Sequence, residues 1–181
     1  VMVLADGMLG QMMEPLEFDD DIRPSGLVEK PWALKGAKGR SPGSIKSLLL
    51  KEGELEGLNI RFQEKYRKIG SLARCEETGV EGAEVVMVAY GSMARIAKAC
   101  IKPLAERGLK AGLIRPVTLW PFPSDRIREL SRTACNFFVT EMSAGQMLED
   151  VRLAVQDDSR VSFYGRMGGG VPSEPEIIEN L

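Results

Sequence analysis

Residues 85–92 read Val85-Val86-Met87-Val88-Ala89-Tyr90-Gly91-Ser92. The first six form an unbroken apolar run rich in β-branched side chains, which is typical of a strand buried on both faces of a parallel sheet. Gly91 interrupts this run, and the hydroxyl of Ser92 predicts the N-cap of a helix that starts there. Apolar residues then recur at helical spacing up to Leu104, so we expect an amphipathic helix on the sheet. Pro103 predicts a kink or an early end of this helix.

The same pattern continues toward the C-terminus. We expect further strands at residues 110–119, 136–141 and 160–164. Helices should follow them, with Ser124 and Ser173 as N-caps of two and a third covering residues 147–155. Because strands that alternate with helices are joined by crossovers between parallel strands, the sequence predicts an α/β fold, a mostly parallel sheet with helices on both faces.

The first part of the chain has a different composition. Residues 1–5 are apolar and predict a buried strand that ends at Asp6-Gly7, and since the chain does not start with Met we expect a longer polypeptide upstream. Residues 14–44 contain four prolines and predict a connecting segment. A short helix, a turn and a longer amphipathic helix at about 58–72 should follow and pack on the domain they join, before a polar loop at 75–82.

Composition excludes several classes of function. A net charge of −2 without a strongly basic run argues against binding to nucleic acid or to an anionic membrane. No apolar stretch reaches the length of a membrane span. The three cysteines are odd in number and far apart, which predicts free thiols in a reducing, cytoplasmic compartment and no metal site. Histidine is absent, which removes the commonest general base and every Ser-His or Cys-His pair.

A candidate site follows from the predicted topology. In a parallel sheet, ligands bind beyond the carboxyl ends of the strands. An alternative stays open, in which the glycines serve turns and Glu141 and Arg166 pair with each other or with a neighbouring subunit. We assign no catalytic residue. The candidate crevice consists of Tyr90, Gly91, Ser92, Glu141, Ser143, Gly145, Gln146 and Arg166.

Five segments that occur in order over nearly the whole chain are residues 5–12 (ADGMLGQM), 30–34 (KPWAL), 114–123 (IRPVTLWPFP), 141–147 (EMSAGQM) and 163–166 (FYGR). Together they resemble one family, the alpha subunits of the 2-oxoacid:ferredoxin oxidoreductases. Because the segments recur in order, the resemblance is specific. Within the family, the 2-ketoisovalerate (3-methyl-2-oxobutanoate) type is more similar than the 2-oxoglutarate type.

The resemblance implies a domain order and a reaction. Residues 1–18 would end a pyrimidine-binding (thiamine diphosphate) domain, residues 19–83 would be a linker with an amphipathic helix, and residues 84–181 would be a transketolase C-terminal-domain-like domain. The intact enzyme would use thiamine diphosphate, Mg and iron–sulfur clusters to convert 2-ketoisovalerate to an acyl-coenzyme A and reduce ferredoxin. Its partners would be a thiamine-diphosphate-binding beta subunit, a gamma subunit and a ferredoxin-like iron–sulfur subunit.

Departures from a complete enzyme suggest that the chemistry lies elsewhere. The Gly-Asp-Gly and Asn-Asn signature of thiamine diphosphate enzymes is absent, and three scattered cysteines cannot supply four thiolates to a cluster. We therefore expect no cofactor on this chain and a structural, assembly role through Trp120, Phe122 and the face at Glu141. Three alternatives remain: a 2-oxoglutarate-type subunit, a transketolase-type dehydrogenase subunit not linked to ferredoxin, and a stand-alone anion- or nucleotide-binding α/β domain. No G-x-G-x-x-G motif follows the first strand to support the last.

Overall fold

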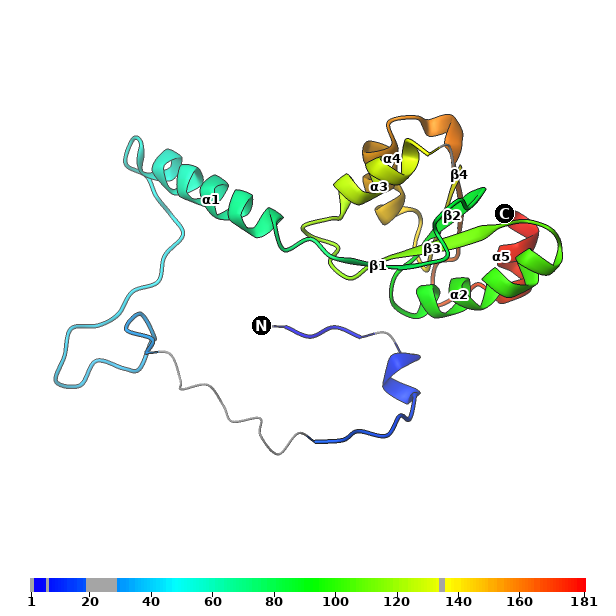
Figure 1. Cartoon of the computed structure of the whole chain (residues 1–181). Coiled ribbons are helices and arrows are strands. Elements are labelled where there is room, and N and C mark those ends of the chain that lie inside the picture. The colour runs from blue at the N-terminus through cyan, green and yellow to red at the C-terminus, as the bar shows by residue number, and fades with distance from the viewer. Residues whose placement is uncertain (1, 6, 19–28, 134–135) are drawn as a thin grey trace. The chain divides into compact units, whose positions relative to one another are not determined.

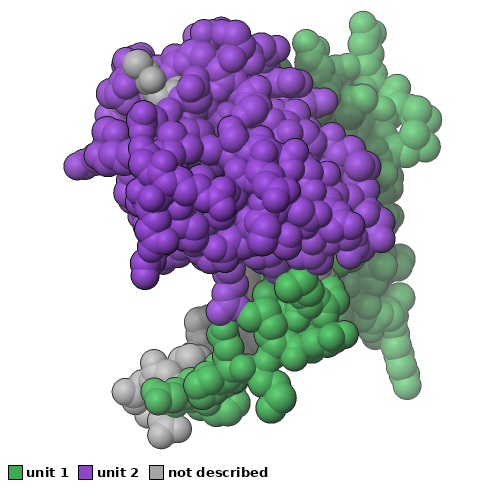
Figure 2. Space-filling view, turned by 90° about the vertical axis from the view of Figure 1, so that its right-hand side faces the viewer, with its two compact units in different colours: residues 1–65 green, residues 66–181 purple. Residues whose placement is uncertain are grey.

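The computed structural model describes residues 2–5, 7–18, 29–133 and 136–181. The chain divides into two compact units, Val1–Lys65 and Tyr66–Leu181 (Figure 2). Val1 and Asp6, from the strand and turn predicted at the start, lie outside the described residues, as does Cys135.

A five-stranded sheet forms the centre of the second unit, with strand order β1-β3-β2-β4-β5 (Figure 1). The first of these strands pairs antiparallel with β3, whereas the other neighbours are parallel. The predicted α/β fold with a mostly parallel sheet is therefore confirmed. The strands are β1 (Cys75–Thr78), β2 (Val85–Val88), β3 (Ala111–Pro116), β4 (Asn136–Glu141) and β5 (Val161–Gly165).

Helices cover both faces of the sheet, as predicted (Figure 1). On one face α2 (Gly91–Glu106) packs against α5 (Glu174–Asn180), and on the other α3 (Ser124–Ser131) packs against α4 (Gln146–Val155). All four residues of β2 are buried because the strand lies between these two layers.

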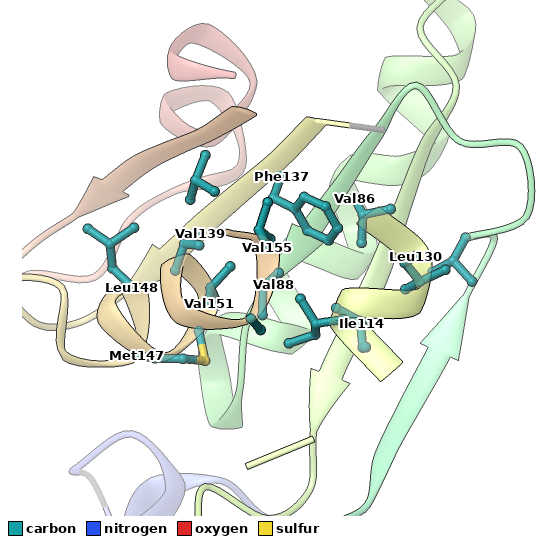
Figure 3. Close-up of a cluster of buried hydrophobic side chains, with 14 of the residues drawn as sticks. Val86, Val88, Ile114, Leu130, Phe137, Val139, Met147, Leu148, Val151 and Val155 are labelled. Carbon is teal, nitrogen blue, oxygen red and sulfur yellow. The ribbon is translucent and has the colours of Figure 1, made fainter. Parts of the chain in front are cut away.

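Each face of the sheet carries its own apolar cluster, because successive side chains of a strand point to opposite faces. Val86 and Val88 of β2 join Phe137 on the side of α3 and α4 (Figure 3). Val85 and Met87 belong to the second cluster, on the side of α2 and α5.

Helix starts were predicted correctly only where a complete capping motif is present. Ser173 caps α5 in a capping box with Glu176, as predicted. Ser92 and Ser124 are not N-caps: α2 begins at Gly91 after Tyr90, and α3 begins at Ser124 itself after Pro123. Neither serine is followed three residues later by the Glu or Gln that would complete a box.

Element ends differ slightly from the predicted ones. The helix α2 continues past Pro103 to Glu106, because its buried face packs on the sheet and offsets the one hydrogen bond that the proline removes. The second predicted strand, β3, is shorter than expected and ends at Pro116, while β4 has the predicted bounds.

Two predictions for the first half of the chain were wrong. The polar loop expected at 75–82 contains β1. Its sequence, Cys-Glu-Glu-Thr, lacks the apolar pattern of a strand, and the strand forms because its backbone pairs with β3. Residues 2–5 are exposed and form no strand, because no other described segment pairs with them.

One continuous helix, α1 (Glu54–Gly70), replaces the predicted pair of helices. Its apolar stripe is present, and none of its residues is buried. That this stripe packs on a domain stays a prediction. No helix among the described residues is long and apolar enough to cross a membrane.

Candidate functional site

The candidate crevice lies at the carboxyl ends of the neighbouring strands β2 and β4, whose following helices cover opposite faces of the sheet. β2 lies between β3 and β4, and the chain leaves β2 for a helix on one face and β4 for a helix on the other. Loops that diverge in this way leave space for a ligand at the carboxyl ends of the two strands. The structure brings Tyr90 after β2 close to Glu141 at the end of β4, and the backbone N–H of Arg166 after β5 donates to the Glu141 carbonyl at 3.1 Å.

Glu141 uses its carboxylate to cap α4. The side chain is fully buried and accepts hydrogen bonds from the backbone N–H groups of Met147 and Leu148, each at 3.0 Å, and from the Ser143 hydroxyl at 2.9 Å. A negative charge is favourable at a helix N-terminus, where the first amides lack partners within the helix. Gly145 occupies the N-cap with φ of 101°, a left-handed conformation that glycine adopts readily, and offers no side-chain cap. Glu141 supplies it instead.

Tyr90 lies half-buried beside this carboxylate. The pKa of Tyr90 is raised above its ordinary value, mainly by burial and to a smaller extent by the charge of Glu141. The phenol therefore stays protonated and neutral at physiological pH. Of its neighbours, Ser92 is buried in the first turn of α2 and Gly91 is exposed.

Arg166 pairs with the last helix. Its Nη1 lies 3.2 Å from Oε1 of Glu176, which also accepts from the Tyr164 hydroxyl at 3.2 Å. The guanidinium therefore faces α5, and of the two pairings left open by the sequence, that with Glu141 is not formed by the side chains. Gln146, the first residue of α4, is exposed.

The described residues do not fit a metal or an iron–sulfur cluster. Among them, no group of three His, Cys, Asp or Glu side chains is placed to hold a metal ion. Cys75 and Cys100 pack against clusters on opposite faces of the sheet and cannot share a cluster. Burial, with a smaller contribution from Glu174, raises the pKa of Cys100 to about 11, which disfavours the thiolate that metals require.

An exposed apolar corner follows β3. Trp120 is 63% exposed and meets Tyr66 edge to face, with ring centroids 5.3 Å apart and planes at 85°. Val117 and Leu119 are also exposed. Phe122, predicted with Trp120 as an interface residue, is partly buried against the cluster of Figure 3 and anchors the corner.

Sequence reasoning missed the role of Glu141 as a cap. The signal was present, because a carboxylate at a strand end precedes a helix whose N-cap position is glycine. It also missed the ion pairs of β1, in which Glu76 faces Arg115 at 3.5 Å and Glu77 binds Arg126 at 2.6 Å.

Comparison with known proteins identifies the family. Residues 83–177 match the model of the pyruvate:ferredoxin oxidoreductase core domain II. The ketoisovalerate oxidoreductase subunit VorB of Methanothermobacter thermautotrophicus is 42% identical over all of this chain and 51% of its own length. The 2-oxoglutarate synthase subunit KorA of Archaeoglobus fulgidus is 34% identical over 92% of this chain and 49% of its own. The chain thus spans about half the length of these relatives.

The fold also has a match among solved structures. The 2-oxoglutarate:ferredoxin oxidoreductase from Magnetococcus marinus, solved with 2-oxoglutarate, coenzyme A and succinyl-CoA, superposes with a TM-score of 0.60 at 23% identity. The match covers 72% of this chain and 23% of that one. The family match and the whole-chain identity together show that the chain belongs to the pyruvate:ferredoxin oxidoreductase core domain II family, in agreement with its resemblance to 2-oxoacid:ferredoxin oxidoreductase alpha subunits.

Proposed function

We propose that this chain is the C-terminal part of the alpha subunit of a ketoisovalerate:ferredoxin oxidoreductase. The observation that carries the proposal is the 42% identity to a ketoisovalerate oxidoreductase subunit over the whole chain. The alternative is a subunit of a 2-oxoglutarate:ferredoxin oxidoreductase, since the 34% identity of the KorA relative extends over 92% of the chain.

The complete enzyme would convert 2-ketoisovalerate to an acyl-coenzyme A and pass the electrons to ferredoxin. Thiamine diphosphate, Mg and the iron–sulfur clusters would be held by the remainder of the subunit and by beta, gamma and ferredoxin-like partner subunits. This division agrees with the chemistry of the described residues, because Glu141 is used by a helix N-terminus and Tyr90 remains a neutral phenol.

In this proposal the chain has three parts. Residues 1–18 end the pyrimidine-binding domain, residues 19–83 form the linker, and residues 84–181 form the transketolase C-terminal-like domain. The linker contains α1 and also β1, which joins the sheet of the last domain. The family match to residues 83–177 supports the last boundary.

The last domain would assemble the enzyme, with the corner of Val117, Leu119 and Trp120 as its contact. All three side chains are at least 40% exposed and follow one another closely in the chain. Exposed aromatic and aliphatic side chains that occur together are typical of interfaces, and Trp is enriched among the residues that dominate binding energy. We propose that a partner subunit covers this corner, which thereby fixes the pyrimidine-binding domain against that partner.

The substrate is tested by a reductase assay on the complete set of subunits. Methyl viologen reduction would be followed with 2-ketoisovalerate, 2-oxoglutarate or pyruvate, each with and without coenzyme A. The proposal predicts the highest kcat/KM with 2-ketoisovalerate and activity that requires coenzyme A. A preference for 2-oxoglutarate would establish the alternative instead, and activity with none of the three acids would contradict the proposed reaction.

A further inference from the structure

A groove lies on the α2 side of the sheet, where β1 and β3 extend beside the helix. Arg115 and Leu113 of β3 share the face that α2 covers, because Leu113 belongs to the cluster of that face and side chains alternate along a strand. The register places Glu76 opposite Arg115 and Thr78 opposite Leu113. These residues and the α2 side chains Arg95 and Lys98 line a cavity with a volume of about 260 Å³.

The charges around this groove are unequal. Apart from Arg95, the described residues that line the groove contribute two cations, Lys98 of α2 and Arg115 of β3, and one carboxylate, that of Glu76. That carboxylate meets Arg115 through a contact of 3.5 Å, with the two side chains 65% and 43% exposed, so the pair is weak and leaves guanidinium N–H groups available. The excess of positive charge is local, because the chain as a whole has a net charge of −2.

We propose that this groove binds the phosphate or diphosphate group of a small molecule. A guanidinium presents planar, paired donors that match phosphate oxygens, Lys98 adds a point charge and the Thr78 hydroxyl adds a neutral donor. The floor at Leu113 is apolar and buried, which reduces solvent screening of the cations above it. The volume lies just below the usual range of small-molecule pockets, so it suits a phosphoryl group better than a whole nucleotide.

This inference is separate from the proposed function, since binding of phosphate in the groove does not depend on which 2-oxoacid the complete enzyme uses. The proposed reaction could fail while phosphate still binds here, and the reverse also holds.

The test is a titration of the 181-residue chain with inorganic pyrophosphate at constant ionic strength, followed by calorimetry and by ¹H–¹⁵N NMR. Lys98→Gln and Arg115→Gln should each raise Kd about fivefold or more, because each removes a charge-assisted contact. Lys110→Gln is the matched control: it removes the same charge from the residue before β3, which does not line the groove, and should leave Kd unchanged. Glu76→Gln should lower Kd, because it removes a negative charge from the described lining of the groove.

Three results would overturn the inference. Equal weakening by Lys110→Gln would show that pyrophosphate responds only to overall charge. Failure of Glu76→Gln to lower Kd, with its NMR spectrum otherwise native, would place the anion elsewhere. Groove-dependent binding of a poly-glutamate peptide without binding of pyrophosphate would assign the groove to an acidic protein partner.

Discussion

The guanidinium of Arg126 donates hydrogen bonds of 2.6 and 2.9 Å to the two carboxylate oxygens of Glu77. The pair joins α3 to the edge strand β1, which the sequence did not reveal as a strand. The hydrogen bonds from Arg126 are the main cause of a pKa of Glu77 below its ordinary value of 4.5. A carboxyl whose pKa is lower in the folded state stabilises the fold above its unfolded pKa, and this contribution disappears as pH falls through the folded pKa.

Substitution Glu77→Gln should therefore lower the free energy of unfolding at pH 7 by about 1 kcal/mol, a value reduced by the partial exposure of the pair. The loss should shrink as pH falls below 4.5, where the wild-type carboxyl itself begins to be protonated. Urea unfolding at several pH values measures both effects. Asp125→Asn, whose carboxylate is 99% exposed in its pair with Arg128, is the matched control and should be nearly silent. Equal effects of the two substitutions would contradict the role of Glu77.

Glu141→Gln should destabilise the second unit by about 2 kcal/mol. The carboxamide replaces one acceptor oxygen with an NH₂ donor, which confronts a buried N–H group of α4 and leaves it without a partner. Denaturant midpoints provide the measurement, and Glu149→Gln on the exposed surface of the same helix provides the comparison, with an expected change below about 0.5 kcal/mol. If Glu141→Gln left the midpoint unchanged, the carboxylate would not be the cap of α4.

Gly165→Ala tests the close approach of β5 to the loop after β4. An added Cβ would lie 2.5 Å from the Phe163 ring and 2.5 Å from the Ser143 carbonyl oxygen, so we expect a loss of about 2–3 kcal/mol from overpacking. Gly168→Ala measures the cost of backbone conformation alone, because Gly168 has φ of 65° but no atom near an added Cβ. We expect this variant to lose about 1 kcal/mol of unfolding free energy. Thermal unfolding ranks the two variants. A larger loss for Gly168→Ala would show that Gly165 is not in tight contact.

The thiol of Cys100 should react far more slowly than that of Cys75. The pKa of Cys100 is raised to about 11 and the side chain is fully buried, while Cys75 is partly exposed. Iodoacetamide labelling of the native protein at pH 8, read by peptide mass spectrometry, should modify Cys75 at least tenfold faster, because thiolate fraction and access both favour it. In denaturant the two rates should converge. Similar rates in the native protein would contradict the burial of Cys100 in the core.

The sequence predicted those features that depend on local pattern. The apolar run of β2 and the Ser-x-x-Glu motif at Ser173 both produced the expected elements, because burial on two faces and reciprocal capping leave strong signals. The edge strand β1 has no such signal in its sequence, since its two glutamates form ion pairs with arginines far along the chain.

The candidate site, too, could be predicted from the sequence only in part. Strand order alone placed Tyr90 and Glu141 near each other, as the rule for parallel sheets predicts. The cap that Glu141 forms on α4 was missed although a carboxylate at a strand end precedes a glycine N-cap, whereas the turn of Arg166 toward Glu176 depends on side-chain packing that spacing in a sequence does not encode.

In the proposed function, the last domain assembles the enzyme and leaves the chemistry to other parts. The most direct test measures methyl viologen reduction with saturating 2-ketoisovalerate and coenzyme A while the concentration of the complete complex is varied. Trp120→Ala should lose activity on dilution in parallel with dissociation seen by mass photometry, yet keep the wild-type kcat where the complex is intact. Leu153→Ala, which removes an exposed side chain from α4, should behave as wild type. A lower kcat in fully assembled Trp120→Ala complex would contradict the claim.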